Sequence, residues 1–253
     1  MNDILIHAQN GITTLTLNRP DKKNSLTSSM YAVLADALAQ AQDDPAVRVV
    51  VLQGHPSVFS AGNDITDFLN SPALREDLPV QRFLQTIAQF PKPLVAAVSG
   101  AAVGIGTTML LHCDLVYAAE NAVFSLPFVD LGLCPEAGSS LLLPQLLGYH
   151  RAAAALLLGE PITAQAALAA GLVNQVVPPD DVEALALAQA QKLAAKPMTA
   201  LMETKRLMKS RQSDVLTRMQ EEQVTFTRLL SEPAAREALT AFLEKRRADY
   251  SKS

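Results

Sequence analysis

Apolar residues follow two different spacings along the first half of the chain, which predicts strands interleaved with helices. The continuous run Val47–Leu52 is typical of a strand covered on both faces in a largely parallel sheet. Before it, apolar residues recur at helical spacing within Ser29–Gln42, and either Ser25 or Thr27 is placed to cap that helix. A second helical pattern follows at Val80–Phe90. Alternation of this kind indicates an α/β core.

Turn signals separate the other predicted elements of this core. Asn10 and Gly11 suit the positive φ of a tight turn, so the chain is expected to begin with a hairpin. The glycines of Gly100–Gly106 mark a second turn, followed by a helix at Thr107–His112. The remaining predicted strands are Ile4–His7, Ile12–Leu17, Leu94–Val98, Leu115–Ala119 and Ala122–Leu126.

After Glu136 the chain is predicted to be almost wholly helical. We expect an α/β core over residues 1–190 and a C-terminal helical region over residues 191–253. This region would pack on the core or on a neighbouring subunit, and it would not form an independent domain. The segments predicted here are helices at Arg151–Leu158, Ala164–Ala170 and Asp181–Ala195, and a strand at Val173–Val177.

Composition excludes several classes of function. With 49% hydrophobic and 18% charged residues, a chain of 253 residues can bury a sizeable core. The net charge of −4 leaves no basic field for a nucleic acid or a membrane surface. Two cysteines are too few for a disulfide scaffold, and no signal-peptide pattern is present, so we expect a cytoplasmic protein. No two of the four histidines have the spacing of a helical metal site, so no metal is expected.

Three other catalytic patterns are incomplete. Ser139 and Ser140 follow a glycine but lack a GxSxG elbow, which disfavours a hydrolase nucleophile. The loop Gly100–Gly106 lacks both a GK[ST] ending and the spacing of a dinucleotide fingerprint. The adjacent His112 and Cys113 would point in different directions, which favours a structural role.

Three segments each join a predicted strand to a sharp turn: Phe59–Asp64, Gly100–Gly106 and Cys134–Gly138. If the main-chain amides of Asn63 and Ile105 converge, they form a two-donor pocket for a developing oxyanion, which is a site for enolate chemistry. The alternative is that both glycine turns serve only the close packing of helix on strand.

Several short motifs occur in order over nearly the whole chain: Asn18-Arg19-Pro20, Asn24-Ser25-Leu26, FSAGND at Phe59–Asp64, SGAAVGIG at Ser99–Gly106, Cys113-Asp114 and AFLEKR at Ala241–Arg246. Together these motifs resemble those of the enoyl-CoA hydratase/isomerase, or crotonase, superfamily. The resemblance implies an α/β ClpP-like spiral of ββα units, with a C-terminal helical region used for assembly. It also implies a homotrimer or a dimer of trimers, and a coenzyme A thioester of fatty acid metabolism as substrate.

By motif position, the resemblance assigns the thioester oxygen to the amides of Asn63 and Ile105. Residues 61–65 would line the path of adenine and pantetheine, and Phe68 would line the acyl tunnel. Lys22 would lie near the adenosine end, while Lys245 would reach the coenzyme phosphates of a neighbouring subunit. The substrate-binding positions expected in this way are Ala61, Gly62, Asp64, Ile65, Gly104, Phe68, Lys22 and Lys245.

The acidic residues point to a branch of this superfamily. Hydratases of the superfamily carry two glutamates that activate water, and here their positions are Thr108 and Phe128. Glu136 instead stands where hydratases have a glycine, which is similar to the 3,2-enoyl-CoA isomerases, whose lone glutamate is the base. Apolar neighbours such as Leu133 and Leu141 are expected to raise the Glu136 pKa toward neutrality.

We therefore expect an isomerase that converts 3-enoyl-CoA to trans-2-enoyl-CoA, with Glu136 as the single proton shuttle and Asn63 and Ile105 as oxyanion donors. This chemistry requires no metal and no redox cofactor. The alternatives are another acyl-CoA reaction on the same scaffold, such as hydration or thioester hydrolysis, and a non-catalytic acyl-CoA-binding subunit.

Overall fold

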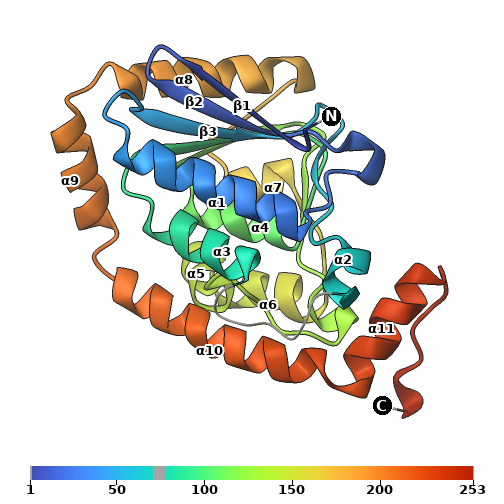
Figure 1. Cartoon of the computed structure of the whole chain (residues 1–253). Coiled ribbons are helices and arrows are strands. Elements are labelled where there is room, and N and C mark those ends of the chain that lie inside the picture. Colours follow the sequence, from blue (N-terminus) through green and yellow to red (C-terminus); the bar gives the residue numbers. More distant parts are fainter. Residues whose placement is uncertain (1, 71–77, 253) are drawn as a thin grey trace.

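Parallel strands and the helices between them build the body of the molecule (Figure 1). The structure is a computed structural model that describes residues 2–70 and 78–252. Within these residues the larger sheet contains, in spatial order, β1 (Ile4–Gln9), β2 (Ile12–Leu17), β3 (Val49–Gln53), β5 (Leu94–Val98), β7 (Leu115–Ala119) and β10 (Gln175–Val177). The smaller sheet contains β4 (Val58–Ser60), β6 (Ala101–Val103), β8 (Val123–Ser125) and β9 (Ile162–Thr163).

Successive ββα units divide their strands between the two sheets. The first strands β3, β5 and β7 are parallel neighbours in the larger sheet, and the second strands β4, β6 and β8 are parallel neighbours in the smaller one. The helices are α1 (Ser28–Asp43), α2 (Ile65–Asn70), α3 (Pro79–Gln89), α4 (Ile105–Thr108), α5 (Ser139–Leu147), α6 (Tyr149–Leu157), α7 (Ala164–Ala170), α8 (Val182–Ala194), α9 (Met198–Met208), α10 (Gln212–Leu230) and α11 (Pro233–Leu243).

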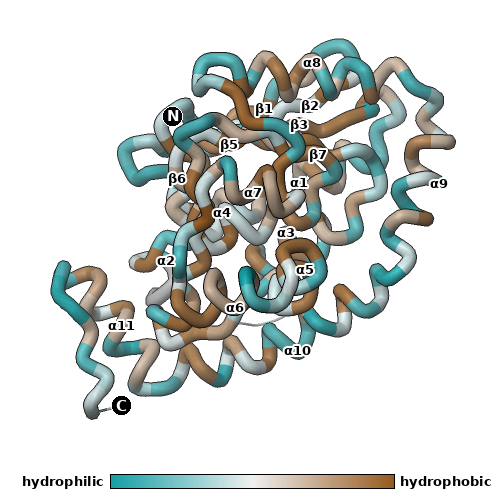
Figure 2. Tube along the Cα trace, turned by 180° about the vertical axis from the view of Figure 1, so that it is seen from behind, coloured by the Kyte–Doolittle hydropathy of each residue, from teal (hydrophilic) through white to brown (hydrophobic). Residues whose placement is uncertain are grey.

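Strand β3 shows why its first four positions are all apolar. Val50 and Leu52 belong to the cluster that packs under α1 and α3, whereas Val49 and Val51 pack under α8 on the opposite face. All four are at most 3% exposed, and burying each side chain of this size stabilises the fold by about 1.5–3 kcal/mol. In Figure 2 the hydrophobic segments accordingly gather along strands such as β3 and β7.

The C-terminal helices wrap around the body. Helix α8 covers the larger sheet up to Ala194, so the boundary expected at residue 190 falls inside this helix. From there α9 leads to α10, which packs against α5 and α3, and α11 follows at the side of the molecule (Figure 1). Among the described residues, no helix is both long and apolar enough to cross a membrane.

Several local predictions are confirmed, and others need correction. Asn10 and Gly11 adopt positive φ between β1 and β2, and the Thr27 hydroxyl caps α1 by accepting from the Met30 amide. The expected turn Gly100–Gly106 is wrong in part, because its residues 101–103 form β6. The helix expected at residues 107–112 begins earlier, at Ile105, and it continues as a 3₁₀ helix over residues 109–112.

Candidate active site

The turn Ala61–Asp64 leaves the smaller sheet after β4 and leads into α2. Asn24 fixes the end of β4, because its side-chain amide donates to the carbonyls of Val58 and Phe59, both at 3.1 Å. Gly62 has φ +90°, and a Cβ atom there would lie 3.0 Å from a backbone carbonyl oxygen of β6. The turn therefore requires glycine at this position for both its conformation and its close approach to β6.

Asp64 ties this turn to the N-terminal part of the chain. One carboxylate oxygen lies 2.7 Å from the Arg19 guanidinium and 3.2 Å from the Ser25 hydroxyl. The other accepts from the amides of Thr66 and Asp67 and so caps α2. Partial burial acts to raise the pKa of Asp64, but the hydrogen bond and charge of Arg19 outweigh it, so the pKa lies below its usual value. Asp64 thus remains ionised and is engaged in holding the turn.

The second turn brings Ile105 to the start of α4. Gly104 has φ +54°, and its amide donates to the Ser125 carbonyl at 2.9 Å. A Cβ atom on Gly106 would lie 3.0 Å from the carbonyl oxygen and the Cβ atom of Ser60, so glycine lets α4 pack against β4. The two glycines consequently place the first amide of α4 next to the Asn63 turn.

The main-chain amides of Asn63 and Ile105 are both available to a ligand. Neither donates a hydrogen bond to another residue within the described ranges. Both residues line one cavity of about 590 Å³, which extends between the smaller sheet and α11. Unpaired main-chain donors in a cavity are the arrangement that an oxyanion requires.

Glu136 lies in the loop that precedes α5. The two residues after it, Ala137 and Gly138, have φ +60° and +73°, which turns the chain sharply into the helix. The Thr108 hydroxyl donates to the Glu136 carboxylate at 2.6 Å. Burial raises the Glu136 pKa to about 7, in the direction expected from its apolar neighbours in the sequence. The hydrogen bond from Thr108 lowers this pKa, whereas the charge of Glu222 raises it further.

Glu222 is a residue of this site that the sequence analysis missed. Its carboxylate, on α10, accepts from the amides of Gly138 at 2.6 Å and Ser140 at 2.9 Å, and so caps α5. On the other side of the loop, His112 Nε2 donates to the Ala137 carbonyl at 2.8 Å. Burial lowers the His112 pKa to about 4, which keeps the ring neutral. The sequence carried one signal: Glu222 lies on the apolar stripe of α10.

Tyr31 is the second missed residue. Its hydroxyl donates to the side-chain oxygen of Asn63. Burial raises the Tyr31 pKa well above its usual value, and the charges of Glu136 and Asp67 add to this effect. Tyr31 therefore remains a neutral donor that orients Asn63. On the sequence it stands among buried apolar positions of α1, which gave no sign of this contact.

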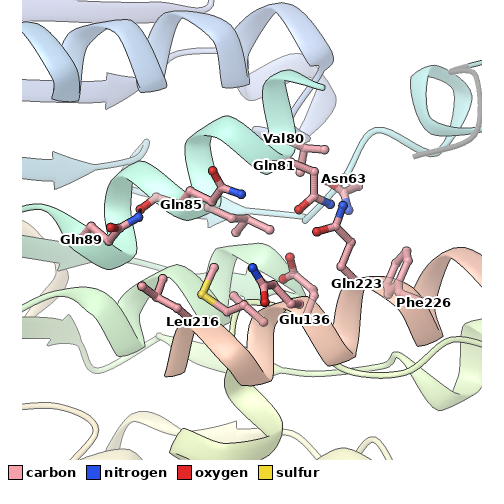
Figure 3. A pocket seen from close by; sticks show the side chains of 13 residues that line it. Asn63, Val80, Gln81, Gln85, Gln89, Glu136, Leu216, Gln223 and Phe226 are labelled. Atoms are coloured by element: carbon pink, nitrogen blue, oxygen red, sulfur yellow. Dashed lines mark hydrogen bonds between the residues drawn. The ribbon is translucent and has the colours of Figure 1, made fainter. Parts of the chain in front are cut away.

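A second cavity, of about 250 Å³, adjoins Glu136. It lies between α3 and α10, and Figure 3 shows Glu136 and Asn63 among the side chains that line it. Asn63 and Phe226 line both cavities, so the two spaces meet at these residues. The free amides and the carboxylate thus border one continuous path from the α11 side to the space between α3 and α10.

The structure brings most of the predicted site residues to this path. The Phe68 side chain lies outside the described part of the structure, although its backbone belongs to α2. Lys245 is exposed just after α11 and lines neither cavity, whereas its neighbour Arg246 lines the larger one. The predicted residues that line the larger cavity are Lys22, Ala61, Gly62, Asn63, Asp64, Ile65, Gly104 and Ile105.

The described residues contain no group of three or more His, Cys, Asp or Glu side chains suited to hold a metal ion. The path does offer two free main-chain donors and Glu136, a carboxylate with a pKa of about 7. Such a site, on a two-sheet ββα scaffold, defines a class of α/β protein built to polarise a carbonyl and to move a proton next to it.

Comparison with known proteins identifies the family. Residues 7–253 match the enoyl-CoA hydratase/isomerase family, and the chain belongs to this family. It is an enzyme of the crotonase superfamily, and its fold is the α/β spiral that the sequence motifs implied.

The relatives carry both isomerase and hydratase names. Rat enoyl-CoA delta isomerase 2 is 38% identical over 89% of this chain, which spans only 59% of that protein. The 2,3-dehydroadipyl-CoA hydratase of Escherichia coli is 36% identical over 99% of both chains. The crystal structure of an enoyl-CoA hydratase/isomerase from Pseudoalteromonas atlantica superposes with a TM-score of 0.94 at 39% identity, covering 99% of this chain and 100% of the other.

Proposed function

We propose that this chain isomerises 3-enoyl-CoA to trans-2-enoyl-CoA, with Glu136 as the single proton shuttle. The observation that carries the proposal is that Glu136 has no second carboxylate beside it in the lining of the smaller cavity, within the part of the chain that the structure describes. Among the described residues that line the smaller cavity, Glu136 is the one carboxylate, and its pKa is about 7. A group of this pKa is able to take up a proton and return it near neutral pH.

The proton path follows from the chemistry of the substrate. The thioester oxygen accepts hydrogen bonds from the Asn63 and Ile105 amides, which acidifies C2. Glu136 removes a C2 proton, the electron pair delocalises into a dienolate, and the same carboxyl group returns the proton to C4. The double bond then lies between C2 and C3. Each amide donor is worth about 3–4 kcal/mol to the developing oxyanion, which takes the place of a Lewis acid. The step needs no redox cofactor because the substrate is neither oxidised nor reduced overall.

Hydration is disfavoured by the residues at the two positions where hydratases carry glutamates. A hydratase of this superfamily uses two glutamates to activate water, and Thr108 and Phe128 occupy those positions here. The Thr108 hydroxyl is already donated to Glu136 at 2.6 Å, and a phenyl ring cannot accept a proton. One acid without a second supports proton transfer between two carbons of the substrate rather than addition of water.

Two thioesters and one variant test this proposal. The purified protein is incubated with 3-hexenoyl-CoA and, separately, with crotonyl-CoA, and the products are separated by chromatography. We expect 2-hexenoyl-CoA from the first and no hydration of the second. Glu136→Gln should abolish isomerisation and still bind acyl-CoA. Consumption of crotonyl-CoA alone, or retained turnover in the variant, would refute the assignment.

We further infer that the chain assembles as a homotrimer or a dimer of trimers. Phe242 and Leu243, at the end of α11, are 61% and 48% exposed, which is typical of a surface that a second subunit covers. Lys245 lies two residues after Leu243 and would then reach the coenzyme phosphates bound by a neighbour. Light scattering after size-exclusion chromatography gives the mass, and a monomer would contradict the inference.

A further inference from the structure

Glutamine side chains dominate the polar part of the smaller cavity. Residues 81, 85 and 89 are spaced by four along α3 and therefore lie on one face of that helix. From the facing helix α10, two more glutamines complete this wall. The glutamines among the described lining residues are Gln81, Gln85, Gln89, Gln220 and Gln223.

Gln81 is the innermost of these residues on α3. It is only 9% exposed, and its side-chain amide makes no hydrogen bond with any residue that the structure describes. Its amide nitrogen and oxygen are not among the fully buried polar atoms of the described residues, so they are open to the cavity that Gln81 lines. Figure 3 shows Gln81 and Gln223 reaching from opposite helices towards the space bordered by Asn63 and Glu136. Both amides are thus placed to bind an atom of whatever fills the cavity.

The charged residues of the cavity restrict which kind of ligand atom the two glutamine amides can bind. The described lining residues include Glu136 but neither lysine nor arginine. Among the described lining residues, a carboxylate on the acyl group would therefore meet a negative charge and no cation. A glutamine amide both donates and accepts, so it matches a hydroxyl or a carbonyl oxygen. The lining favours an uncharged oxygen.

The position of the smaller cavity indicates which part of the substrate binds there. Coenzyme A would enter on the α11 side, and the thioester carbonyl would lie at the amides of Asn63 and Ile105 in the larger cavity, next to the smaller cavity that Asn63 also lines. The acyl chain beyond the reacting carbons then extends between α3 and α10. At about 250 Å³ this space is smaller than an ordinary ligand pocket, which limits it to a short chain.

We propose that the physiological substrate is a short acyl-CoA that carries an uncharged oxygen function beyond C4, bound by Gln81 and Gln223. This inference rests on the proposed function only for the direction in which the acyl chain lies. A purely hydrocarbon chain would leave both amides without partners, and water retained beside them would lower its affinity.

Binding of saturated thioesters tests the inference without turnover. Hexanoyl-CoA, 5- and 6-hydroxyhexanoyl-CoA and adipoyl-CoA, which ends in a carboxylate, are titrated into the wild-type protein by calorimetry. We expect one hydroxylated thioester to bind about tenfold more tightly than hexanoyl-CoA, and adipoyl-CoA to bind most weakly. Equal or tighter binding of hexanoyl-CoA, or tightest binding of adipoyl-CoA, would overturn the proposal.

The double variant Gln81→Met/Gln223→Met identifies the groups responsible. Methionine keeps the side-chain length and removes the amides, so the preference for the hydroxyl should disappear while hexanoyl-CoA binds at least as well. Gln40→Met, on the exposed face of α1 and outside both cavities, is the matched control. A preference that survives in the double variant would overturn the assignment. If 3-hexenoyl-CoA is not isomerised although this preference holds, the proposed function fails and the acyl specificity stands.

Discussion

Removing the Thr108 hydroxyl is the sharpest test of how Glu136 is tuned. In the variant Thr108→Val the side chain keeps its shape and loses the donor that lies 2.6 Å from the Glu136 carboxylate. Because this hydrogen bond stabilises the ionised form, it lowers the Glu136 pKa, against burial and the charge of Glu222. The variant should therefore have a higher Glu136 pKa and need a higher pH to act as a base.

The size of the shift follows from the strength of the bond. A hydrogen bond to a charged group is worth about 1.5–3 kcal/mol, which corresponds to about 1–2 pKa units. Water in the adjoining cavity replaces part of the lost bond, so we expect about one unit. The wild-type pKa is about 7, and the variant should have a pKa of about 8.

The assay is the pH dependence of kcat/KM for 3-hexenoyl-CoA, which reports the pKa of the free enzyme. Glu136 acts in its ionised form, so the rate should fall about tenfold per pH unit below the midpoint. At pH 6 the variant should be slower than wild type by about tenfold, and at pH 9 the two should be nearly equal. Thr108→Ser restores the hydroxyl and should bring the midpoint back.

Thr107→Val is the matched control for this experiment. The Thr107 hydroxyl donates to the Ala102 carbonyl at 2.6 Å, so its loss affects the fold of the glycine loop and not Glu136 directly. Its pH midpoint should stay at about 7 whatever happens to kcat. The reasoning is refuted if Thr108→Val leaves the midpoint unchanged or lowers it.

Three further predictions concern substitutions of charged residues, two beside the site and one in the ion pair of Lys205 and Asp114. Since the Glu136 pKa rises from an unfolded value of 4.5 to about 7 in the fold, the folded state binds the extra proton, and stability falls as pH rises from about 4.5 to 7. Glu136→Gln should thus stabilise the protein by about 3 kcal/mol at pH 8 and by little at pH 4.5 in denaturant titrations; equal effects at both would contradict this. Glu222→Gln should lower the pH midpoint of kcat/KM by a fraction of a unit, and a rise would speak against the charge effect. Lys205→Met leaves Asp114 without the ammonium group 2.7 Å away and should cost about 2–4 kcal/mol of unfolding free energy; an unchanged denaturation midpoint would show that the ion pair contributes nothing.

Elements of the fold could be predicted from the sequence wherever the hydrophobic pattern extended over a whole helix or strand. The β-branched run of β3 and the helical spacing of α1 each cover a whole element, and both were predicted within two residues of the observed bounds. Strand β6 was not predicted, because three residues between glycines carry no period. It exists because β4 and β8 flank it in the smaller sheet, and such pairing is a tertiary effect.

The residues of the candidate site also fall into two groups, those that the sequence indicated and those that only the packed structure revealed. Asn63 and Ile105 were proposed because each follows a glycine in a turn that is visible in the sequence, and Glu136 was proposed because it stands where the hydratases of the family have a glycine. Glu222 and Tyr31 were missed because their contacts join distant segments: the Glu222 carboxylate meets the Gly138 amide across 84 residues. Local patterns carry no information on which helix face will oppose which loop, so partners of this kind emerge only when α10 and α1 are packed on the core.

In the reaction proposed here, one carboxylate serves both as base and as acid, and these contacts give it the proton affinity that both roles require. Burial alone would raise the Glu136 pKa and favour the protonated form, which cannot begin the reaction. The Thr108 hydroxyl restores part of the ionised form, while His112 and Glu222 hydrogen-bond to the backbone around the carboxylate, and the Glu222 charge also raises its pKa. A side chain that must reach both C2 and C4 needs a fixed loop and a balanced proton affinity. The Glu222 carboxylate contributes to both properties, whereas the Thr108 hydroxyl acts on the proton affinity, so substitution of Thr108 should move the pH midpoint without loosening the loop.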